Sequence, residues 1–370
     1  MRTSPLKESF AQAGATFTQR YGVEIVEKVA DHQAEYDLVR NSVGLSDFSF
    51  MQKYRIPEEY AIDFLDTVLA GNVARTRFGR MLHTFLANEH GKIIADCYVA
   101  NNDEEFILLC ESLVSDKELN DILQKAGAAD AHLQDITATH ALISLDGYQA
   151  WKVAKELFGA DILGLPYLSI EMYSFEDTQI RFMRTGKTSE FGYCLMVPNE
   201  QATGLLDKCR ELSSACEGNL IGNLIHNDLR LEGRFFNIFA EGKEVGDPLE
   251  LGLQWMIDFD KETFIGSQHI LDQREKGFAN KIIGISTPEE TRKLAVGTAI
   301  LDEGRKAGNI VAASYSYLLN KTIALALLPV DIAYSGLDFV VATQPEQPVR
   351  TISMPPIFPK SLSVKLDEME

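Results

Sequence analysis

From about Lys281 to its end, the chain consists of short β-like runs separated by glycine-containing turns, and helical patterns are scarce there. The runs read KIIGI, GTAIL, GNIVAAS, TIALALL and DFVVAT. Many short strands with turn signals between them are typical of a small all-β barrel or sandwich. A chain of 370 residues has room for this unit and for one or two others before it.

Ahead of residue 281, strand-like and helix-like patterns alternate, which predicts an α+β region. Pro57 opens a predicted helix, and Gly71 is expected in the left-handed conformation at its end. The apolar residues of this helix recur at helical spacing, namely Ala61, Phe64, Leu65, Val68 and Leu69.

Three strand-like runs follow, MLHTFLAN, IIADCYVA and the run from Phe106 to Cys110. Short polar turns join them, so we expect a three-stranded antiparallel meander. Ser115 and Glu118 then form a capping box for the next helix. Strands and helices alternate in the same way between about residues 140 and 216.

Composition and charge exclude several classes of protein. The chain has 35 Lys and Arg against 54 Asp and Glu, a net charge of −19, which repels nucleic acids and anionic membrane surfaces. The five cysteines form no C-x-x-C pair, and neither a signal-like leader nor a long apolar span is visible. We therefore expect a cytoplasmic protein without a disulfide framework.

Common catalytic and metal-binding motifs are missing. Gly186-Lys187-Thr188 resembles the end of a phosphate-binding loop, but position 181 is Arg instead of the required glycine. The sequence contains no G-x-G-x-x-G, no G-x-S-x-G, and no His or Cys cluster with zinc spacing. No metal site is predicted.

Asp96 is a lone carboxylate in the apolar run IIADCYVA. Alternation along a strand places it on the face of Ile94 and Tyr98, away from Ile93 and Cys97. An exposed carboxylate is the ordinary case. A buried one would be costly unless it is paired. Residue type alone does not decide whether Asp96 is solvated or buried and paired.

A second candidate region is DLRLEGRFFNIFAEGKEVGDPLELGLQW. Its Arg230 can present a flat, bidentate donor to a carboxylate, and Trp255 can offer a stacking face. A structural ion pair and a core aromatic residue are the equally open alternatives.

The order of the segments RNSVGLSDFSFM, NEHGKIIAD, RTGKTSEFGY, NDLRLEGR, DPLELGLQW and DFDKETFIG resembles the T-protein (aminomethyltransferase) superfamily of the glycine cleavage system. The resemblance covers nearly the whole chain. It implies a multi-subdomain α+β fold, with residues 1–280 as a folate-binding region of two interleaved subdomains and residues 281–370 as a C-terminal β-barrel. It also implies a central hole that holds tetrahydrofolate.

The resemblance further implies roles for individual residues. Asp96 matches the family carboxylate that faces the reactive folate nitrogens, as a general base or as an electrostatic partner. Met51 matches a methionine that packs near the pterin, and Arg230 an arginine of the folate region. Trp255 matches the aromatic residue that closes the pocket.

Three positions depart from the family pattern. Ala95 replaces the first acidic residue of the strand, and His83 replaces a folate-contacting tyrosine. Cys194 replaces the glutamate that accepts hydrogen bonds from the pterin edge, and a thiol is a poor acceptor. The resemblance implies that His83 and Cys194 line the folate site together with Met51, Asp96, Arg230 and Trp255.

The leading predicted function is a tetrahydrofolate-dependent one-carbon transferase that acts on a small molecule, either aminomethyltransferase-like or a demethylase of an N-, O- or S-methyl compound. An acidic lipoyl carrier protein is a disfavoured partner, because the −19 charge repels it. The alternatives are a folate-independent lyase or hydrolase with Asp96 as base, and the iron–sulfur-assembly branch of the superfamily. That branch carries a cysteine motif where this chain reads DKETFIGSQH.

Overall fold

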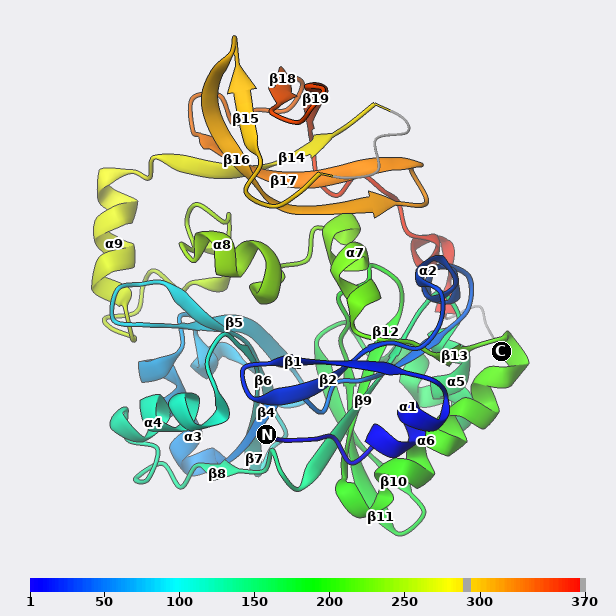
Figure 1. Cartoon of the computed structure of the whole chain (residues 1–370). Helices are drawn as coiled ribbons and strands as arrows, with labels where there is room; N and C mark the ends of the chain where they lie inside the picture. Colours follow the sequence, from blue (N-terminus) through cyan, green and yellow to red (C-terminus); the bar gives the residue numbers. More distant parts are fainter. Residues whose placement is uncertain (289–293, 367–370) are drawn as a thin grey trace.

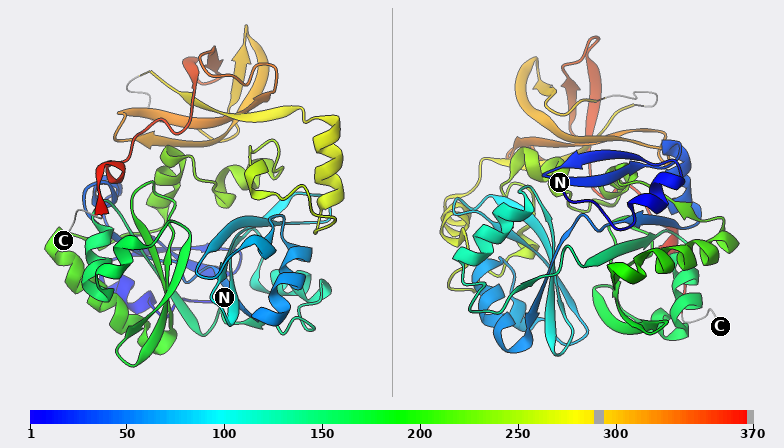
Figure 2. Two further views of the ribbon diagram at one scale, coloured as in Figure 1. Left: turned by 180° about the vertical axis from the view of Figure 1, so that it is seen from behind. Right: turned by 60° about the horizontal axis from the view of Figure 1, so that its bottom comes forward.

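The computed structural model describes residues 1–288 and 294–366. Two helix-covered sheets lie side by side, and a β-barrel stands on the same side of both (Figure 1). The views in Figure 2 show the same three parts, with a mostly helical segment between the sheets and the barrel.

The first sheet contains the predicted meander, and its strand order is β5-β6-β7-β4-β8. One face packs against α3 (Glu58–Val68) and α4 (Asp116–Lys125), where Cys97 and Val99 lie in the apolar core. The strands are β4 (Gln52–Pro57), β5 (Met81–Ala87), β6 (Ile93–Asn101), β7 (Glu105–Ser112) and β8 (Gln134–Asp135).

The sequence signals for the starts of α3 and α4 are confirmed, whereas the predicted glycine cap at the end of α3 is wrong. Pro57 is the N-cap of α3, and Ser115 and Glu118 make the expected capping box of α4. Gly71 does not adopt a positive φ. Its N–H instead donates to Thr84 Oγ1 at 2.8 Å, and an added Cβ would lie 2.9 Å from that oxygen. Close packing, and not a helix cap, requires this glycine.

The sequence predicted that Asp96 shares one face of its strand with Tyr98 and Ile94. This prediction is right for Tyr98 and wrong for Ile94. Ala87 pairs with Ile93 and Leu86 with Ala95, so Ile94 is an extra residue in β6. It packs with Ala95 on the helix-covered face. A bulge of this kind breaks the strict alternation that the prediction assumed.

The second sheet has the order β10-β11-β12-β9-β3-β13, and α5 (Ala150–Phe158) and α6 (Asn199–Ser213) pack on it around a large apolar core. The strands are β3 (Gly44–Asp47), β9 (His140–Asp146), β10 (Ser169–Phe175), β11 (Thr178–Arg184), β12 (Gly192–Pro198) and β13 (Asn219–Leu220). Residues of both sheets share one apolar cluster, including Tyr98 and Leu109 from the first and Leu142 and Met196 from the second. The sheets therefore meet face to face at this cluster.

The remaining elements before the barrel flank the two sheets (Figure 1). At the N-terminus these are α1 (Lys7–Gln12), β1 (Thr16–Arg20), β2 (Val23–Lys28) and α2 (His32–Asn41). Below the barrel they are α7 (Leu224–Gly233), η4 (Ile238–Gly242), α8 (Lys243–Val245), η5 (Gln254–Met256) and α9 (Ser267–Lys276). The short turns η1 (Val73–Arg75), η2 (Ala160–Gly164), η3 (Ser214–Cys216) and η6 (Lys360–Ser363) complete the set.

The C-terminal strands close into the predicted barrel, in the order β14-β17-β16-β15-β18-β19. Its strands are β14 (Asn280–Ser286), β15 (Ala299–Asp302), β16 (Arg305–Ser316), β17 (Lys321–Pro329), β18 (Asp338–Val341) and β19 (Gln347–Ile352). Glu232 of α7 accepts a hydrogen bond from Ser316 Oγ of β16, which ties the barrel to the helical segment. Within the described residues, no helix combines the length and apolar character needed to cross a membrane.

Candidate active site

Asp96 is buried between the two sheets, with 1% of its surface exposed. In the register of β6 and β7 it lies directly opposite Glu111, which is also buried. Two like charges at such a pair of positions repel each other. Lys187, from the loop between β11 and β12, resolves this repulsion: its Nζ donates to Asp96 Oδ2 and lies 3.4 Å from Glu111 Oε2.

Arg230 of α7 completes a four-charge network. Its Nη1 and Nη2 donate to the two oxygens of Glu111 at 2.7 and 2.5 Å, which is a bidentate pair. Two cations thus balance two carboxylates in a buried volume. Burial by itself would raise the pKa of Glu111, but Arg230 and Lys187 outweigh it and lower this pKa to about 2.

His83 holds the other oxygen of Asp96. Its Nε2 lies 2.7 Å from Asp96 Oδ1, and its ring stacks on Tyr98 with centroids 4.2 Å apart. Burial lowers the pKa of His83, with Asp96 acting in the opposite direction. Burial would raise the pKa of Asp96, but Lys187 and His83 together hold it below its ordinary value. Asp96 is therefore an ionised carboxylate at neutral pH.

A cavity lies beside this network, between the two sheets. Apolar side chains from both sheets line it, including Met51, Leu109 and Leu142, together with polar groups such as Glu111 and Lys187. The volume open to the centres of water molecules is about 30 Å³, enough for very few waters. The Lys187 side chain occupies the space in front of Asp96.

Several buried polar atoms at the cavity lack a hydrogen-bond partner within the described part of the chain. They are Tyr98 Oη, Asp146 Oδ1, Thr185 Oγ1 and Arg230 Nε. Buried polar atoms are normally paired, and unpaired ones cost free energy. Donors and acceptors left open around one cavity indicate a polar ligand. Among the described residues, no group of three His, Cys, Asp or Glu is arranged to hold a metal ion.

Family comparisons agree with this architecture. Residues 6–261 match the GCVT N-terminal domain, and residues 280–358 match the glycine cleavage T-protein C-terminal barrel domain. The chain belongs to the glycine cleavage T-protein family. An aminomethyltransferase of Desulfitobacterium hafniense (strain Y51) is 28% identical over 348 residues, which are 92% of this chain and 94% of the relative.

A second relative and a solved structure are equally extensive matches. An aminomethyltransferase of Thermotoga petrophila is 26% identical over 357 residues, covering 94% and 97% of the two chains. The crystal structure of glycine cleavage system aminomethyltransferase T from Bartonella henselae matches with a TM-score of 0.81 at 21% identity, covering 96% and 97%. This likeness shows the T-protein fold. Aminomethyltransferases of this family carry out folate-dependent one-carbon transfer with tetrahydrofolate.

The six predicted site residues take three kinds of position in this T-protein fold. Met51, Cys194 and Arg230 line the cavity. Asp96 and His83 do not line the cavity themselves. They contact two residues that do, Lys187 and Tyr98 respectively. Trp255 is 63% exposed, its ring lies edge-to-face with that of His83 with the centroids 5.3 Å apart, and it does not line the cavity.

Two alternatives left open by the sequence are now decided. Asp96 is buried and paired, not solvated. The two terminal nitrogens of Arg230 are engaged by Glu111, so a structural ion pair occupies the groups that could have held a ligand carboxylate. Arg230 lines the cavity, and its Nε makes no hydrogen bond within the described residues.

Sequence reasoning missed Lys187, Glu111 and Asp146. Glu111 carried the same signal as Asp96, a lone carboxylate in an apolar strand, and pairing the meander strands would have placed the two together. Lys187 was considered only as part of a phosphate-binding loop. Asp146 ends a strand before a glycine, where a turn residue is ordinary.

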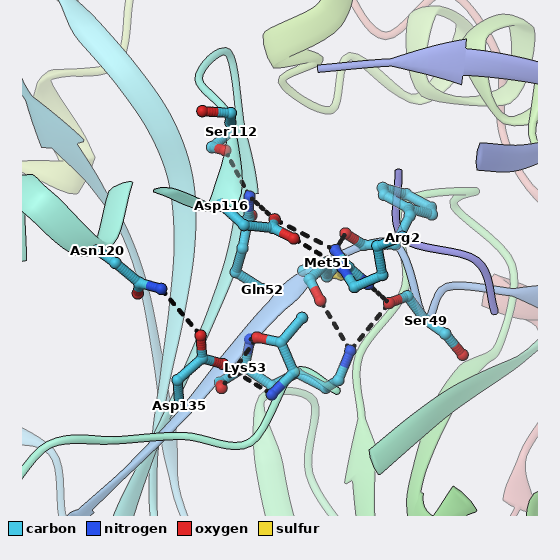
Figure 3. Close-up of polar contacts among 12 residues, drawn as sticks. Arg2, Ser49, Met51, Gln52, Lys53, Ser112, Asp116, Asn120 and Asp135 are labelled. Carbon is cyan, nitrogen blue, oxygen red and sulfur yellow. Dashed lines mark hydrogen bonds and ion pairs between the residues drawn. The ribbon is translucent and has the colours of Figure 1, made fainter. Parts of the chain in front are cut away.

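The turn that carries Met51 is held by two cations (Figure 3). Arg2 donates to the carbonyls of Ser49 and Phe50, each at 2.7 Å, and Lys53 Nζ donates to those of Ser49 and Met51 at 2.9 and 2.8 Å. Burial, followed by the charge of Arg2, lowers the pKa of Lys53 to about 7. One wall of the cavity thus depends on the N-terminal segment.

Replacing Arg2 by Ala is expected to lower the free energy of unfolding by about 1–3 kcal/mol, because the charged donor to two carbonyls and to Asp116 is lost. Lys7→Ala is the control, since it removes a surface ion pair with Glu24 and a contact with the Phe17 ring, and it should cost less than about 1 kcal/mol. Urea denaturation measures both. Equal midpoints for the two variants would show that Arg2 does not anchor the turn.

The residues present fit tetrahydrofolate in their chemistry. Apolar side chains, including Met51, Leu109 and Leu142, line the cavity and can face a flat ring. The unpartnered atoms at the cavity include a donor, Arg230 Nε, and an acceptor, Asp146 Oδ1, as a ring with polar edges requires. The space available requires the Lys187 side chain to move when a ring of that size enters.

Proposed function

We propose that this chain is a tetrahydrofolate-dependent one-carbon transferase that acts on a small methylated or aminomethylated substrate in the central cavity. The observation that carries this proposal is the ionised Asp96, buried beside a cavity with unpartnered polar atoms. Membership of the T-protein family supports the cofactor.

Asp96 acts in this proposal as an electrostatic partner and not as a general base. Its lowered pKa makes it a weak proton acceptor at neutral pH. An ionised carboxylate in a water-poor site strongly stabilises positive charge that develops nearby. Tetrahydrofolate, when bound, supplies the nitrogen that accepts the one-carbon unit.

Lys187 controls access to Asp96 in this scheme. Its ammonium contacts Asp96 directly, and Glu111 lies 3.4 Å away as a second carboxylate. A lysine stem is long and flexible, so the ammonium can leave one carboxylate while it keeps the other. Ligand binding then exchanges the Lys187–Asp96 contact for contact between Asp96 and the ligand.

The apolar walls and the small volume of the cavity support a small substrate. The net charge of −19 disfavours docking of an acidic lipoyl carrier protein, because like charges slow association. A free N-, O- or S-methyl compound fits these two observations better than a carrier-bound aminomethyl group.

Calorimetric titration with tetrahydrofolate under anaerobic conditions tests the cofactor. We expect one molecule bound per chain with micromolar affinity. Absence of binding at high micromolar ligand would contradict the proposal and leave a folate-independent lyase or hydrolase as the alternative. If folate binds, a panel of methylated amines, ethers and thioethers, with detection of the one-carbon product on folate, identifies the donor class.

A further inference from the structure

Asp146 is a buried carboxylate that the proposed function does not use. It is the last residue of β9 and is 1% exposed. Its Oδ2 accepts a hydrogen bond from Ser144 Oγ at 2.5 Å, whereas its Oδ1 is buried and makes no hydrogen bond within the described residues. No Lys, Arg or His in residues 1–288 or 294–366 forms an ion pair with it.

Two glycines lie against the unpartnered oxygen of Asp146. Gly186 and Gly192 lie against Oδ1, and a Cβ added to either would be 2.8 or 3.1 Å from it. Larger residues at these two positions would cover this oxygen. Asp146, Gly186 and Ser144 all line the cavity.

A chain of hydrogen bonds connects Asp146 to Cys194. The Cys194 thiol lies 3.7 Å from Ser144 Oγ, and Ser144 in turn donates to Asp146. Strand register produces this chain, because Cys194 pairs with Ser144 across β12 and β9. Burial raises the pKa of the Cys194 thiol to about 12, so the thiol stays neutral and leaves Asp146 as the carboxylate at this end of the cavity.

Burial also raises the pKa of Asp146 to about 7, although Ser144, Arg230 and Thr188 act in the opposite direction. A buried carboxylate without a cation and with one oxygen unpaired is costly. The cost is removed if a ligand donates to Oδ1, since N–H donors favour the ionised form.

We propose that Asp146 is a ligand-binding residue of the central cavity and accepts hydrogen bonds from the N–H edge of a reduced pterin. This inference rests on the proposed function. The aminopyrimidine edge of a pterin carries adjacent N–H donors, and a carboxylate is the natural acceptor for them. Arg230 Nε, the open donor of the same cavity, complements the acceptors of such a ring.

Calorimetry with tetrahydrofolate on Asp146→Asn tests the inference. An amide replaces one acceptor oxygen by a donor, so we expect the dissociation constant to rise at least about tenfold. Glu241→Gln is the matched control, because Glu241 is also a buried carboxylate with a pKa raised by burial but does not line the cavity. It should change the affinity less than about twofold, the effect of a site without ligand contact.

A ligand analogue keeps the test decisive if Asp146→Asn does not fold. Wild-type protein should bind tetrahydrofolate at least about tenfold more tightly than an analogue in which a methyl group replaces the 2-amino group. In a folded Asp146→Asn variant this preference should largely disappear. Equal affinities for the two ligands in the wild type would overturn the inference.

The pH dependence of binding provides a third measurement. Affinity should rise as the pH increases through about 7, because ionised Asp146 is the better acceptor. The other titratable or charged groups at the cavity are Tyr98, whose pKa burial raises well above its ordinary value, and Glu111, Lys187, Cys194, His226 and Arg230. Burial and the charge of Arg230 lower the pKa of His226 to about 3, so His226 does not change charge in this range. Lys53, with a pKa of about 7, is the group to exclude, and Lys53→Met should retain the pH dependence that Asp146→Asn loses.

The possible results separate this inference from the proposed function. If the wild type binds tetrahydrofolate and Asp146→Asn binds it equally well, Asp146 is a structural residue and the proposed function stands. If the wild type does not bind tetrahydrofolate at all, both the function and the inference are wrong. Weaker binding by Asp146→Asn, together with unchanged binding by Glu241→Gln, supports both.

Discussion

Replacing Asp96 by Asn is expected to reduce turnover at least about a hundredfold while the chain remains folded. Asn has the same shape, so it fills the same place in β6 beside His83. It carries no charge, and the stabilisation of positive charge at the cavity is lost. Turnover is measured with tetrahydrofolate and the donor identified in the substrate panel.

Asp103→Asn is the matched control for this change. Asp103 lies in the exposed turn between β6 and β7, with φ of 64°, a conformation that Asn tolerates well. The same chemical substitution should leave turnover within about twofold there, as expected for a surface site. Thermal unfolding of both variants verifies that they fold. A fully active Asp96→Asn enzyme would show that Asp96 is not catalytic and that another residue has this role.

Replacing Arg230 by Met should lower the free energy of unfolding at neutral pH by about 3–5 kcal/mol. The wild-type network balances Lys187 and Arg230 against Asp96 and Glu111, all buried. Loss of Arg230 leaves one carboxylate in excess. Urea denaturation measures the effect, with Arg210→Met as a surface control whose nearest carboxylate is a weak contact at 3.8 Å.

A double variant and a change of pH test the explanation for Arg230. Arg230→Met with Glu111→Leu removes one charge of each sign, so it should be more stable than Arg230→Met alone. The pKa of Glu111 is lowered in the folded protein, so its pairing stabilises the fold above the ordinary pKa of a glutamate and is lost as the pH falls toward 2. The defect of Arg230→Met should therefore shrink in acid. A double variant less stable than the single one would refute the charge-balance explanation.

Signals carried by a few neighbouring residues predicted most of the architecture. Pro57 and the Ser115–Glu118 capping box begin their helices as expected, because caps depend on contacts within one turn. The apolar-rich runs between turn signals predicted the meander and the barrel strands, and the meander strands are buried along nearly their whole length. The two local errors, at Gly71 and Ile94, arose where a contact with another strand overrode the local pattern.

The sequence by itself determined the family, the order of the elements, and Asp96 as an unusual carboxylate, because these depend on local pattern and on matched segments. Only the tertiary structure decided the charge pairing. Lys187 meets Asp96 across 91 positions of sequence and Arg230 meets Glu111 across 119. Strand register and the packing of loops over a sheet decide which partners a buried ion has. Neither can be inferred from the residues next to the charge in the sequence.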